Sequence, residues 1–404
     1  MKSVLYCLLF LQLPALPVFA TGAHPPPASS PARLLTSFPF LQFTGGVIVV
    51  KGQVNNSPDT LNFIMDTGSG GISLDSATCV RLKLPVTASD KYVRGIGGTK
   101  RLSFSENNTL VLPGLRIDSM DFHINDYTFI SSVYGVQIDG IIGYSFFNKY
   151  IVRFDYDSMK VYVYSPGQYT YKEGGELLKP SMTSIPIVPA PLRNRVKVSN
   201  RYYFDMGAGL CLLLSQQFAD DSSLFQRRRQ RRRVIKTEVQ GMTGKIEMSM
   251  TTVREFRIGR YSFHNVPTYV FDDVSNVTYY PYLGGLIGND LLRRFNVVLN
   301  YPEKQIYLYP NAHFKDRFDY SYTGLIMYFI DGAVVVTDVI KHSPAEAAGF
   351  RPDDIILAVN NNFSNNIQTY RELLKDVGTN AHLIIRRNGE LMEKKLRIKS
   401  ILSR

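Results

Sequence analysis

Short apolar runs separated by turn-forming residues make up most of this chain. Residues 47–50 and 61–65 are largely apolar, and residues 55–59, Asn-Asn-Ser-Pro-Asp, lie between them. Runs of this length around such a turn predict a β-hairpin. The second run ends at Asp66, and a carboxylate at the end of a buried strand costs free energy unless its charge is used. Asp66 is therefore a candidate for chemistry, although Asp-Thr-Gly by itself equally fits a strand that ends in a tight turn.

A glycine-rich hairpin is predicted downstream of this acid. Residues 92–104 form two strand-like runs around Gly95, Ile96, Gly97 and Gly98. The alternative is a phosphate-binding loop, but the Lys followed by Ser or Thr that such a loop requires is missing from its place here. We therefore expect a mobile hairpin with a glycine tip.

The chain repeats itself. Residues 141–150 match residues 286–295, an offset of 145, and the match continues from residues 160–164 to residues 305–309. Earlier features recur in the same order: residues 117–123 at 258–264, residues 95–98 at 241–244, and residues 65–70 at 204–209, which include Asp205. This repeat predicts two copies of one β-rich unit, each with an acid after a strand, a glycine-tipped hairpin and an apolar pair that ends in glycine.

The two copies would bring Asp66 and Asp205 to equivalent positions about a pseudo-twofold axis. Two carboxylates held together cannot both ionise near neutral pH, so such a pair shares a proton. The ionised member can take a proton from water while the protonated member donates to a carbonyl oxygen. That chemistry hydrolyses a peptide bond without a metal, a cofactor or a covalent intermediate. Glycines after each acid would let the two backbones approach each other.

The end of the chain has a different pattern, which predicts a separate small α+β domain at residues 313–404. We expect strands at 332–339 and 353–360, a capped helical turn at 343–349, a helix at 367–374, and closing strands at 382–385 and 394–398.

Composition and charge add two open questions. The 404 residues carry 46 Lys and Arg against 34 Asp and Glu, and six arginines lie between Arg227 and Arg233. No aromatic residue interleaves with them, so a solvated surface is favoured over an anionic surface as partner, and no specific nucleic acid is expected. Cys79 and Cys211 fit either one disulfide or two buried free thiols.

The N-terminus predicts export. Lys2 precedes an apolar stretch at residues 4–19, and Val18-Phe19-Ala20 resembles a cleavage site, so residues 1–20 read as a signal peptide. The alternative is an uncleaved membrane anchor. A proline-rich spacer is expected at residues 21–37. We expect a periplasmic or cell-envelope location, or alternatively secretion.

Three segments together resemble a known family. Residues 66–69, 95–98 and 141–143 look like the active-site loop, the flap tip and the supporting segment of retropepsin-like aspartic proteases. With the second set, from Asp205 to Gly288, the chain is similar to bilobal bacterial exported aspartic proteases that carry a C-terminal PDZ domain. Residues 343–356 resemble the matching stretch of bacterial PDZ domains.

The resemblance implies a mainly β fold with two duplicated lobes and a PDZ domain. It implies lobe 1 at residues 38–170, a linker at 171–195 and lobe 2 at 196–312. It also implies roles for individual residues: Asp66 and Asp205 as the catalytic dyad, Thr67, Gly68, Ser69 and Gly207 as its support, Gly95, Ile96, Gly97 and Gly98 as the flap that touches substrate, and Gly324, Leu325 and Ile326 as the PDZ loop that binds a peptide C-terminus. The implied function is an aspartic endopeptidase with peptide or protein substrates, whose PDZ domain captures C-terminal tails of substrates or partners.

One residue departs from the family pattern. Met206 follows the second acid, where the family usually has a hydroxyl residue. The threonine hydrogen bonds beneath the dyad therefore cannot form symmetrically, which leaves a catalytically weak or inactive peptide-binding envelope protein as the alternative. No metal-ligand spacing and no serine elbow motif is present in the sequence.

Overall fold

The computed structural model describes residues 30–95, 98–225, 234–241 and 244–402. The predicted signal peptide at residues 1–20, the flap residues Ile96 and Gly97, and the arginine run from Arg227 to Arg233 lie outside the described residues. In the described ranges, no helix has the length and apolar character needed to cross a membrane.

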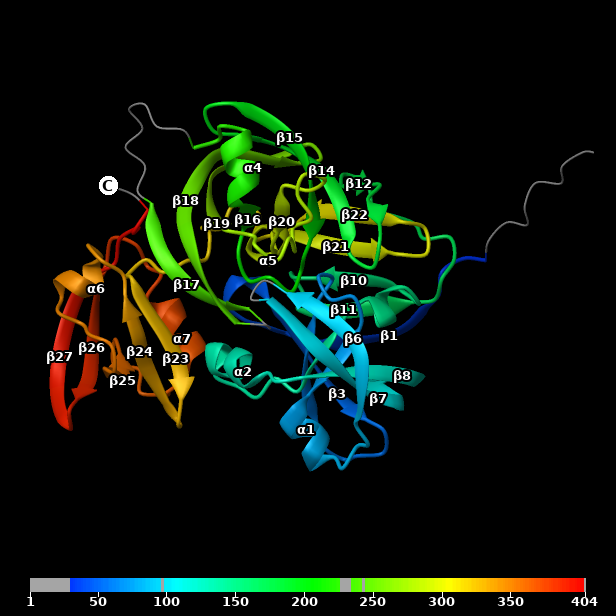
Figure 1. Ribbon diagram of the computed structural model, residues 1–404, viewed down its shortest axis with the longest axis horizontal. Coiled ribbons are helices and arrows are strands. Elements are labelled where there is room, and N and C mark those ends of the chain that lie inside the picture. Colours follow the sequence, from blue (N-terminus) through cyan, green and yellow to red (C-terminus); the bar gives the residue numbers. More distant parts are fainter. Residues whose placement is uncertain (1–29, 96–97, 226–233, 242–243, 403–404) are drawn as a thin grey trace, which may run out of the picture.

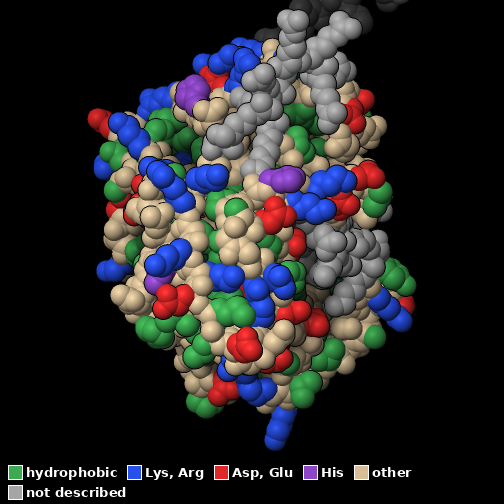
Figure 2. Space-filling view, turned by 90° about the vertical axis from the view of Figure 1, so that its left-hand side faces the viewer, with side chains coloured by type: hydrophobic (Ala, Val, Ile, Leu, Met, Phe, Trp, Pro, Cys, Tyr) green, Lys and Arg blue, Asp and Glu red, His purple; other side chains and the backbone are tan. Residues whose placement is uncertain are grey.

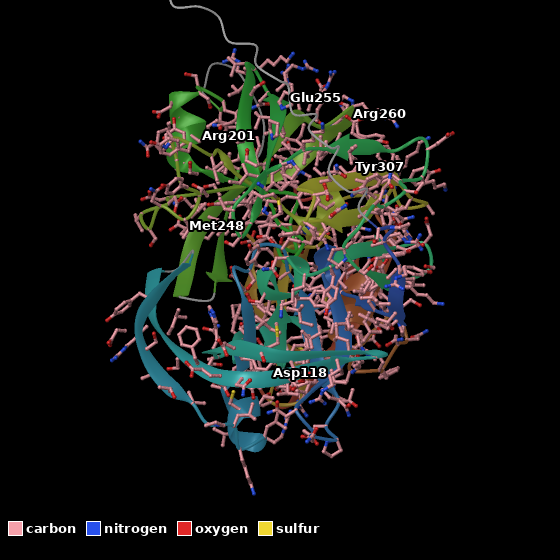
Figure 3. The ribbon with its side chains drawn as sticks, turned by 90° about the vertical axis from the view of Figure 1, so that its right-hand side faces the viewer. Asp118, Arg201, Met248, Glu255, Arg260 and Tyr307 are labelled. Atoms are coloured by element: carbon pink, nitrogen blue, oxygen red, sulfur yellow. The ribbon has the colours of Figure 1, made fainter. Side chains whose placement is uncertain are left out.

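Two β lobes of the same strand order form the larger part of the molecule (Figure 1). Lobe 1 is an eight-stranded sheet in the order β2-β3-β4-β9-β5-β8-β7-β6, and lobe 2 is an eight-stranded sheet in the order β13-β14-β15-β20-β16-β19-β18-β17. The positions correspond one to one, as the sequence repeat predicts. Figure 3 shows the lobes one above the other, with Asp118 on the lower lobe and Arg201 and Glu255 on the upper lobe.

The strands of lobe 1 are β2 (Leu41–Gln42), β3 (Ile48–Val54), β4 (Leu61–Met65), β5 (Ile72–Asp75), β6 (Thr87–Gly95), β7 (Gly98–Leu112), β8 (Leu115–Asn125) and β9 (Gly140–Ile142). Those of lobe 2 are β13 (Ser181–Met182), β14 (Pro186–Arg193), β15 (Lys197–Phe204), β16 (Leu212–Ser215), β17 (Ile235–Gly241), β18 (Gly244–Ile258), β19 (Tyr261–Phe271) and β20 (Gly285–Ile287). Short helices repeat as well: α1 (Ser76–Arg81) and α3 (Tyr144–Phe147) correspond to α4 (Gln216–Asp221) and α5 (Asn289–Leu292). Helix α2 (Thr128–Tyr134) has no such counterpart, because residues 272–284 join β19 to β20 through turns.

A six-stranded sheet joins the lobes. It contains β1 (Leu34–Pro39), β10 (Ile151–Asp155), β11 (Lys160–Tyr164), β12 (Glu176–Leu178), β21 (Phe295–Asn300) and β22 (Gln305–Pro310), in the order β1-β11-β10-β21-β22-β12. Strands β10 and β21, one from each copy of the repeat, pair antiparallel with Val152 opposite Leu299. One hydrophobic core then runs through both lobes and this sheet.

Two predicted boundaries are wrong. The spacer expected at residues 21–37 overlaps β1, which begins at Leu34, and the linker expected at residues 171–195 contains β12, β13 and β14. Three of the prolines in the expected linker lie in β14, where Pro189 and Pro191 fall between the end of its pairing with β13 and the start of its pairing with β18. That stretch is a sheet edge, and a sheet edge tolerates residues that cannot donate a ladder hydrogen bond.

The C-terminal domain has its own hydrophobic core. Its sheet has five strands in chain order: β23 (Leu325–Ile330), β24 (Ala333–Val339), β25 (Ile355–Val359), β26 (Asn380–Arg387) and β27 (Glu390–Arg397), with helices α6 (Pro344–Ala347) and α7 (Ile367–Leu373). The predicted helical turn is confirmed as α6, whose N-cap Ser343 accepts a hydrogen bond from the Glu346 amide at 3.2 Å. Together these sheets confirm the predicted mainly β fold with a small α+β domain at the end.

Candidate active site

Each lobe delivers an aspartate at the end of a buried strand. Asp66 follows β4, and its amide donates to the carbonyl of Ile142 at 2.9 Å. Asp205 follows β15, and its amide donates to the carbonyl of Ile287, also at 2.9 Å. Ile142 ends β9, which runs parallel to β4, and Ile287 ends β20, which runs parallel to β15. The apolar-apolar-glycine segments found in the sequence therefore hold both acids in equivalent positions.

The two acids meet across the lobes. A Cβ built at Gly68 would lie 2.5 Å from the Asp205 Cγ, and a Cβ built at Gly207 would overlap the Asp66 carboxyl group. A side chain fits at neither position, so both glycines are required by close approach. The carboxyl groups of Asp66 and Asp205 share a hydrogen bond. The structure thus brings together the pair that the repeat predicts.

The surroundings of the two acids differ. The Gly68 amide donates to Asp66 Oδ1 at 2.7 Å, whereas the amides of both Gly207 and Ala208 donate to Asp205 Oδ1 at 2.9 Å. Burial, and then the charge of Asp205, raises the pKa of Asp66 well above its ordinary value. Burial also raises the pKa of Asp205, but hydrogen bonds from Asp66 and the two amides oppose the rise. Because burial raises the pKa of both acids, the pair retains a proton to higher pH than a free aspartate would.

Beneath the dyad, Thr67 forms a one-sided hydrogen-bond network. Its hydroxyl donates to the Phe204 carbonyl at 2.7 Å and accepts the Met206 amide at 2.9 Å. Thr67 is fully buried, and the Met206 side chain is fully buried in the hydrophobic core. One threonine therefore links the two loops where a symmetric site would use two, as the departure at Met206 predicts.

Sequence reasoning missed Tyr301, whose hydroxyl is buried near the dyad. At the repeat offset its counterpart is Tyr156, which donates from Oη to Asn289 Oδ1 at 3.1 Å. Tyr301 instead faces Tyr144, with ring centroids 6.1 Å apart, and its hydroxyl has no hydrogen-bond partner among the described residues. Burial raises the pKa of Tyr301, and so do the charges of Asp66 and Asp205. The offset of 145 that pairs these tyrosines was the signal that would have found it.

The remaining predicted site residues lie around this centre. The Ser69 carbonyl accepts a hydrogen bond from the Tyr144 amide at 3.0 Å. The Ser69 hydroxyl donates a hydrogen bond to the Gly71 carbonyl at 3.3 Å, within the same loop. Gly95 pairs with Gly98 at the end of the β6–β7 hairpin, and Gly241 pairs with Gly244 in the equivalent β17–β18 hairpin. The hairpin of lobe 1 that the sequence predicts and its counterpart in lobe 2 are therefore both present, up to the glycines on either side of their tips.

The predicted PDZ loop residues lie at the start of β23, outside the two loops that carry the acids. The Gly324 amide donates to Ser321 Oγ at 2.9 Å, and Leu325 is buried in the core of the C-terminal domain. Ile326 packs beside a cluster that includes Met250 of lobe 2 and Ile340. This loop therefore faces lobe 2.

Within the part of the chain that the structure describes, no group of three or more His, Cys, Asp or Glu residues is arranged to hold a metal ion. Cys79 and Cys211 are both free and buried, which resolves the alternatives that the sequence left open. Burial and the charge of Asp75 raise the pKa of Cys79 to about 11, so this thiol is unreactive at neutral pH.

The fold and the paired acids define a bilobal, acid-protease-like architecture followed by a small peptide-binding type of domain. Comparison with protein families agrees: residues 50–146 match the aspartyl protease family, and residues 335–387 match the PDZ domain family. The chain therefore carries a retropepsin-like aspartyl protease domain and a C-terminal PDZ domain. A comparison of the chain with curated proteins gives no match.

Proposed function

We propose that this chain is an aspartic endopeptidase in which Asp66 and Asp205 activate one water molecule between them. The observation that carries the proposal is the mutual approach of the loops, in which each glycine, Gly68 and Gly207, lies against the opposite acid. Two buried carboxyls that share a proton form the acid and base pair that hydrolysis by activated water requires. The match of residues 50–146 to the aspartyl protease family supports the same chemistry.

The asymmetry of the site suggests a role for each acid. Ionised Asp205 takes a proton from the water, whose oxygen forms a bond to the peptide carbonyl carbon, and Asp66 gives its proton to the carbonyl oxygen. The resulting tetrahedral diol then collapses: the C–N bond breaks, the amine leaves with a proton from Asp205, and a hydroxyl proton returns to Asp66. Each acid therefore ends the cycle in its starting protonation state. The β6–β7 hairpin would close over the substrate and exclude bulk water from the site.

A cleavage assay tests this proposal. A library of peptides is incubated with wild type, Asp66→Asn and Asp205→Asn between pH 3 and pH 8, with Asp118→Asn as the control because Asp118 is an exposed residue of lobe 1 (Figure 3). We expect both dyad variants to lose at least ~10³-fold in kcat/KM and the control to match wild type. Cleavage that survives either dyad substitution would remove these residues from the mechanism.

One observation favours a second candidate function. The Thr67 network is one-sided because Met206 supplies no hydroxyl, so the chain also fits a catalytically weak envelope protein that binds peptides in the cleft. Wild-type protein that cleaves nothing at any pH, yet binds the same peptides, would favour this candidate.

We also propose that the protein is exported, to the periplasm, to the cell envelope or out of the cell, on the strength of the apolar stretch at residues 4–19. N-terminal sequencing of the mature protein tests this, with cleavage after Ala20 expected.

The arginine run stays a predicted surface feature. On the side of the molecule that Figure 2 shows, Lys and Arg side chains are interspersed with Asp and Glu.

A further inference from the structure

Helix α2 of lobe 1 lies between that lobe and the PDZ domain (Figure 1). Its inner side chains, Ile130 and Tyr134, pack on a small cluster of lobe 1 that includes Ile64 of the strand leading to Asp66. Its outer side meets β23, the edge strand of the PDZ sheet. An edge strand of this kind is where PDZ domains receive an extended peptide as an additional strand.

The α2 segment fills that edge with its own side chains and backbone. The rings of Phe129 and Tyr328 meet edge to face with centroids 5.0 Å apart. Gly135, which ends the helix at φ 73°, lies so close to the PDZ domain that an added Cβ would come within 2.5 Å of Ile367 on α7 and 3.6 Å of Phe329 on β23. The end of α2 is therefore wedged between the strand and the helix that bound the groove.

Arg371 spans the same groove. From α7, its guanidinium donates to Met327 O of β23 at 2.7 Å and to Val133 O of α2 at 2.6 Å. Gln368, one turn earlier, donates to Tyr134 O at 3.1 Å. These two side chains satisfy carbonyl groups at the C-terminal end of α2, which the helix itself leaves unpaired. The groove is thus bridged by hydrogen bonds that a peptide strand beside β23 would have to replace.

The same contacts reach the protease cleft. Gln368 Oε1 accepts from the amide and the hydroxyl of Thr44 at 2.9 and 2.8 Å, and Asp319 accepts the Gly45 amide at 2.7 Å. Tyr134 stacks on Phe43, and a Cβ at Gly209, four residues after Asp205, would lie 3.5 Å from the Tyr134 hydroxyl. The groove and the active-site loops are therefore joined through one packed set of residues.

We propose that the PDZ groove of this chain is a docking site for its own helix α2, and that a peptide with a free C-terminus enters the groove only by displacing α2. A cavity of about 200 Å³ remains beside β23, where Leu325, Met327 and Leu374 supply apolar surface and Arg371 supplies positive charge. Lys375 also lines the cavity, with its charge paired to Asp319 at 3.0 Å. This chemistry fits a peptide that ends in an apolar residue with a free carboxylate. Gly209 and Thr44 of the protease also line this cavity. A peptide bound there would therefore contact the loop that follows Asp205.

Cross-linking tests whether α2 is docked in solution. The variant Phe129→Cys/Tyr328→Cys is treated with a short bismaleimide. The native thiols Cys79 and Cys211 are buried, and Cys7, which lies in the predicted signal peptide, is replaced by Ser. The matched control replaces Tyr328→Cys by Glu390→Cys on β27, at the opposite edge of the PDZ sheet. We expect at least ~10-fold more intramolecular product in the first variant, since its two positions touch. Equal yields would overturn the proposal.

Peptide binding tests whether the docked helix closes the groove. Fluorescent decapeptides with random last residues and free carboxylates are titrated into full-length wild type, Phe129→Asp and Thr128→Asp, with C-terminally amidated peptides alongside. Phe129→Asp places a charge against Tyr328, whereas Thr128 is an exposed residue on the same helix. We expect Phe129→Asp to bind the free-carboxylate peptides at least ~10-fold more tightly than wild type and Thr128→Asp to match wild type. Equal binding by all three proteins, or no binding of free-carboxylate peptides by Phe129→Asp, would contradict the proposal. Neither readout requires turnover, so its failure is separable from a failure of the proposed peptidase activity.

Discussion

The Thr67 hydroxyl accepts the Met206 amide at 2.9 Å and donates to the Phe204 carbonyl at 2.7 Å, so one side chain of lobe 1 serves two backbone groups of lobe 2. Thr67→Val keeps the shape and removes both hydrogen bonds. Each buried group left unpaired costs about 1–3 kcal/mol, so we expect unfolding free energy to fall by about 3 kcal/mol and kcat to fall with it.

Denaturant unfolding and peptide cleavage check this prediction, with Thr67→Ser as the control that keeps the hydroxyl. If Thr67→Val were as stable and as active as Thr67→Ser, the hydroxyl would have no part in holding the two loops together.

Close approach of the loops makes a second prediction. Gly68→Ala would place a Cβ 2.5 Å from Asp205 Cγ, whereas Gly70→Ala in the same loop would place one at an ordinary 3.5 Å from Ser184 Oγ. A small displacement of reacting groups costs about 10²-fold in rate, so we expect at least that loss for Gly68→Ala and near wild-type activity for Gly70→Ala. Steady-state kinetics measures both. Comparable activities would mean that Gly68 lies farther from the Asp205 carboxyl group than described.

The pairing of the two acids and the duplication of the β-rich unit could be predicted because they depend on local patterns that occur twice. The offset of 145 pairs the segment around Ile142 with the segment around Ile287, and each segment supports an acid. The stretch around Pro189 is expected to be a linker because proline and glycine are typical of connecting segments. Here Pro189 lies in a strand that forms a hairpin with β15, at a sheet edge where proline is tolerated.

Helix α2 was not predicted for a related reason. Residues 128–134, Thr-Phe-Ile-Ser-Ser-Val-Tyr, contain β-branched and aromatic residues that have low helix propensity. Its structure depends on contacts to Tyr328 and Arg371, which lie about 200 residues later in the chain. The packing of the PDZ domain on lobe 1 is therefore a tertiary property that no window of the sequence encodes.

The raised pKa of Asp66 predicts that the dyad lowers stability at neutral pH. Below the ordinary aspartate pKa of 3.8, folded and unfolded chains both hold the proton, and Asp66 contributes no pH dependence. Above it, the unfolded chain releases a proton that the folded chain keeps, so stability falls as pH rises toward the folded-state pKa. Asp66→Asn removes this penalty.

We therefore expect Asp66→Asn to unfold at a higher temperature than wild type at pH 7, with the difference shrinking below pH 3.8. Thermal unfolding followed by circular dichroism measures it, and Asp118→Asn serves as the surface control. A variant less stable than wild type at pH 7 would show that the ionised Asp66 carboxyl stabilises the fold, whereas its burial predicts that the ionised form is disfavoured.

Glu255 shows the opposite linkage in the wall of lobe 2. Hydrogen bonds from Arg193, Arg257 and Ser262, at 2.8, 2.7 and 2.9 Å, lower the pKa of Glu255 from 4.5 to about 2. The stability that this ion contributes is complete above pH 4.5 and is lost as pH falls toward 2. Arg193 belongs to β14 and Glu255 to β18, so the hydrogen bonds of Glu255 also stabilise the pairing of these two strands.

Glu255→Gln should accordingly unfold at a lower temperature than wild type at pH 7, with the gap closing as pH approaches 2. Glu247→Gln is the matched control, because Glu247 lies on the same strand and its 2.7 Å bond to Lys236 joins two exposed side chains, an arrangement that contributes little. Calorimetric scans of the three proteins from pH 2 to pH 7 provide the measurement. A Glu255→Gln deficit that stays constant across this range would assign the effect to packing, since only a charged Glu255 makes the deficit depend on pH.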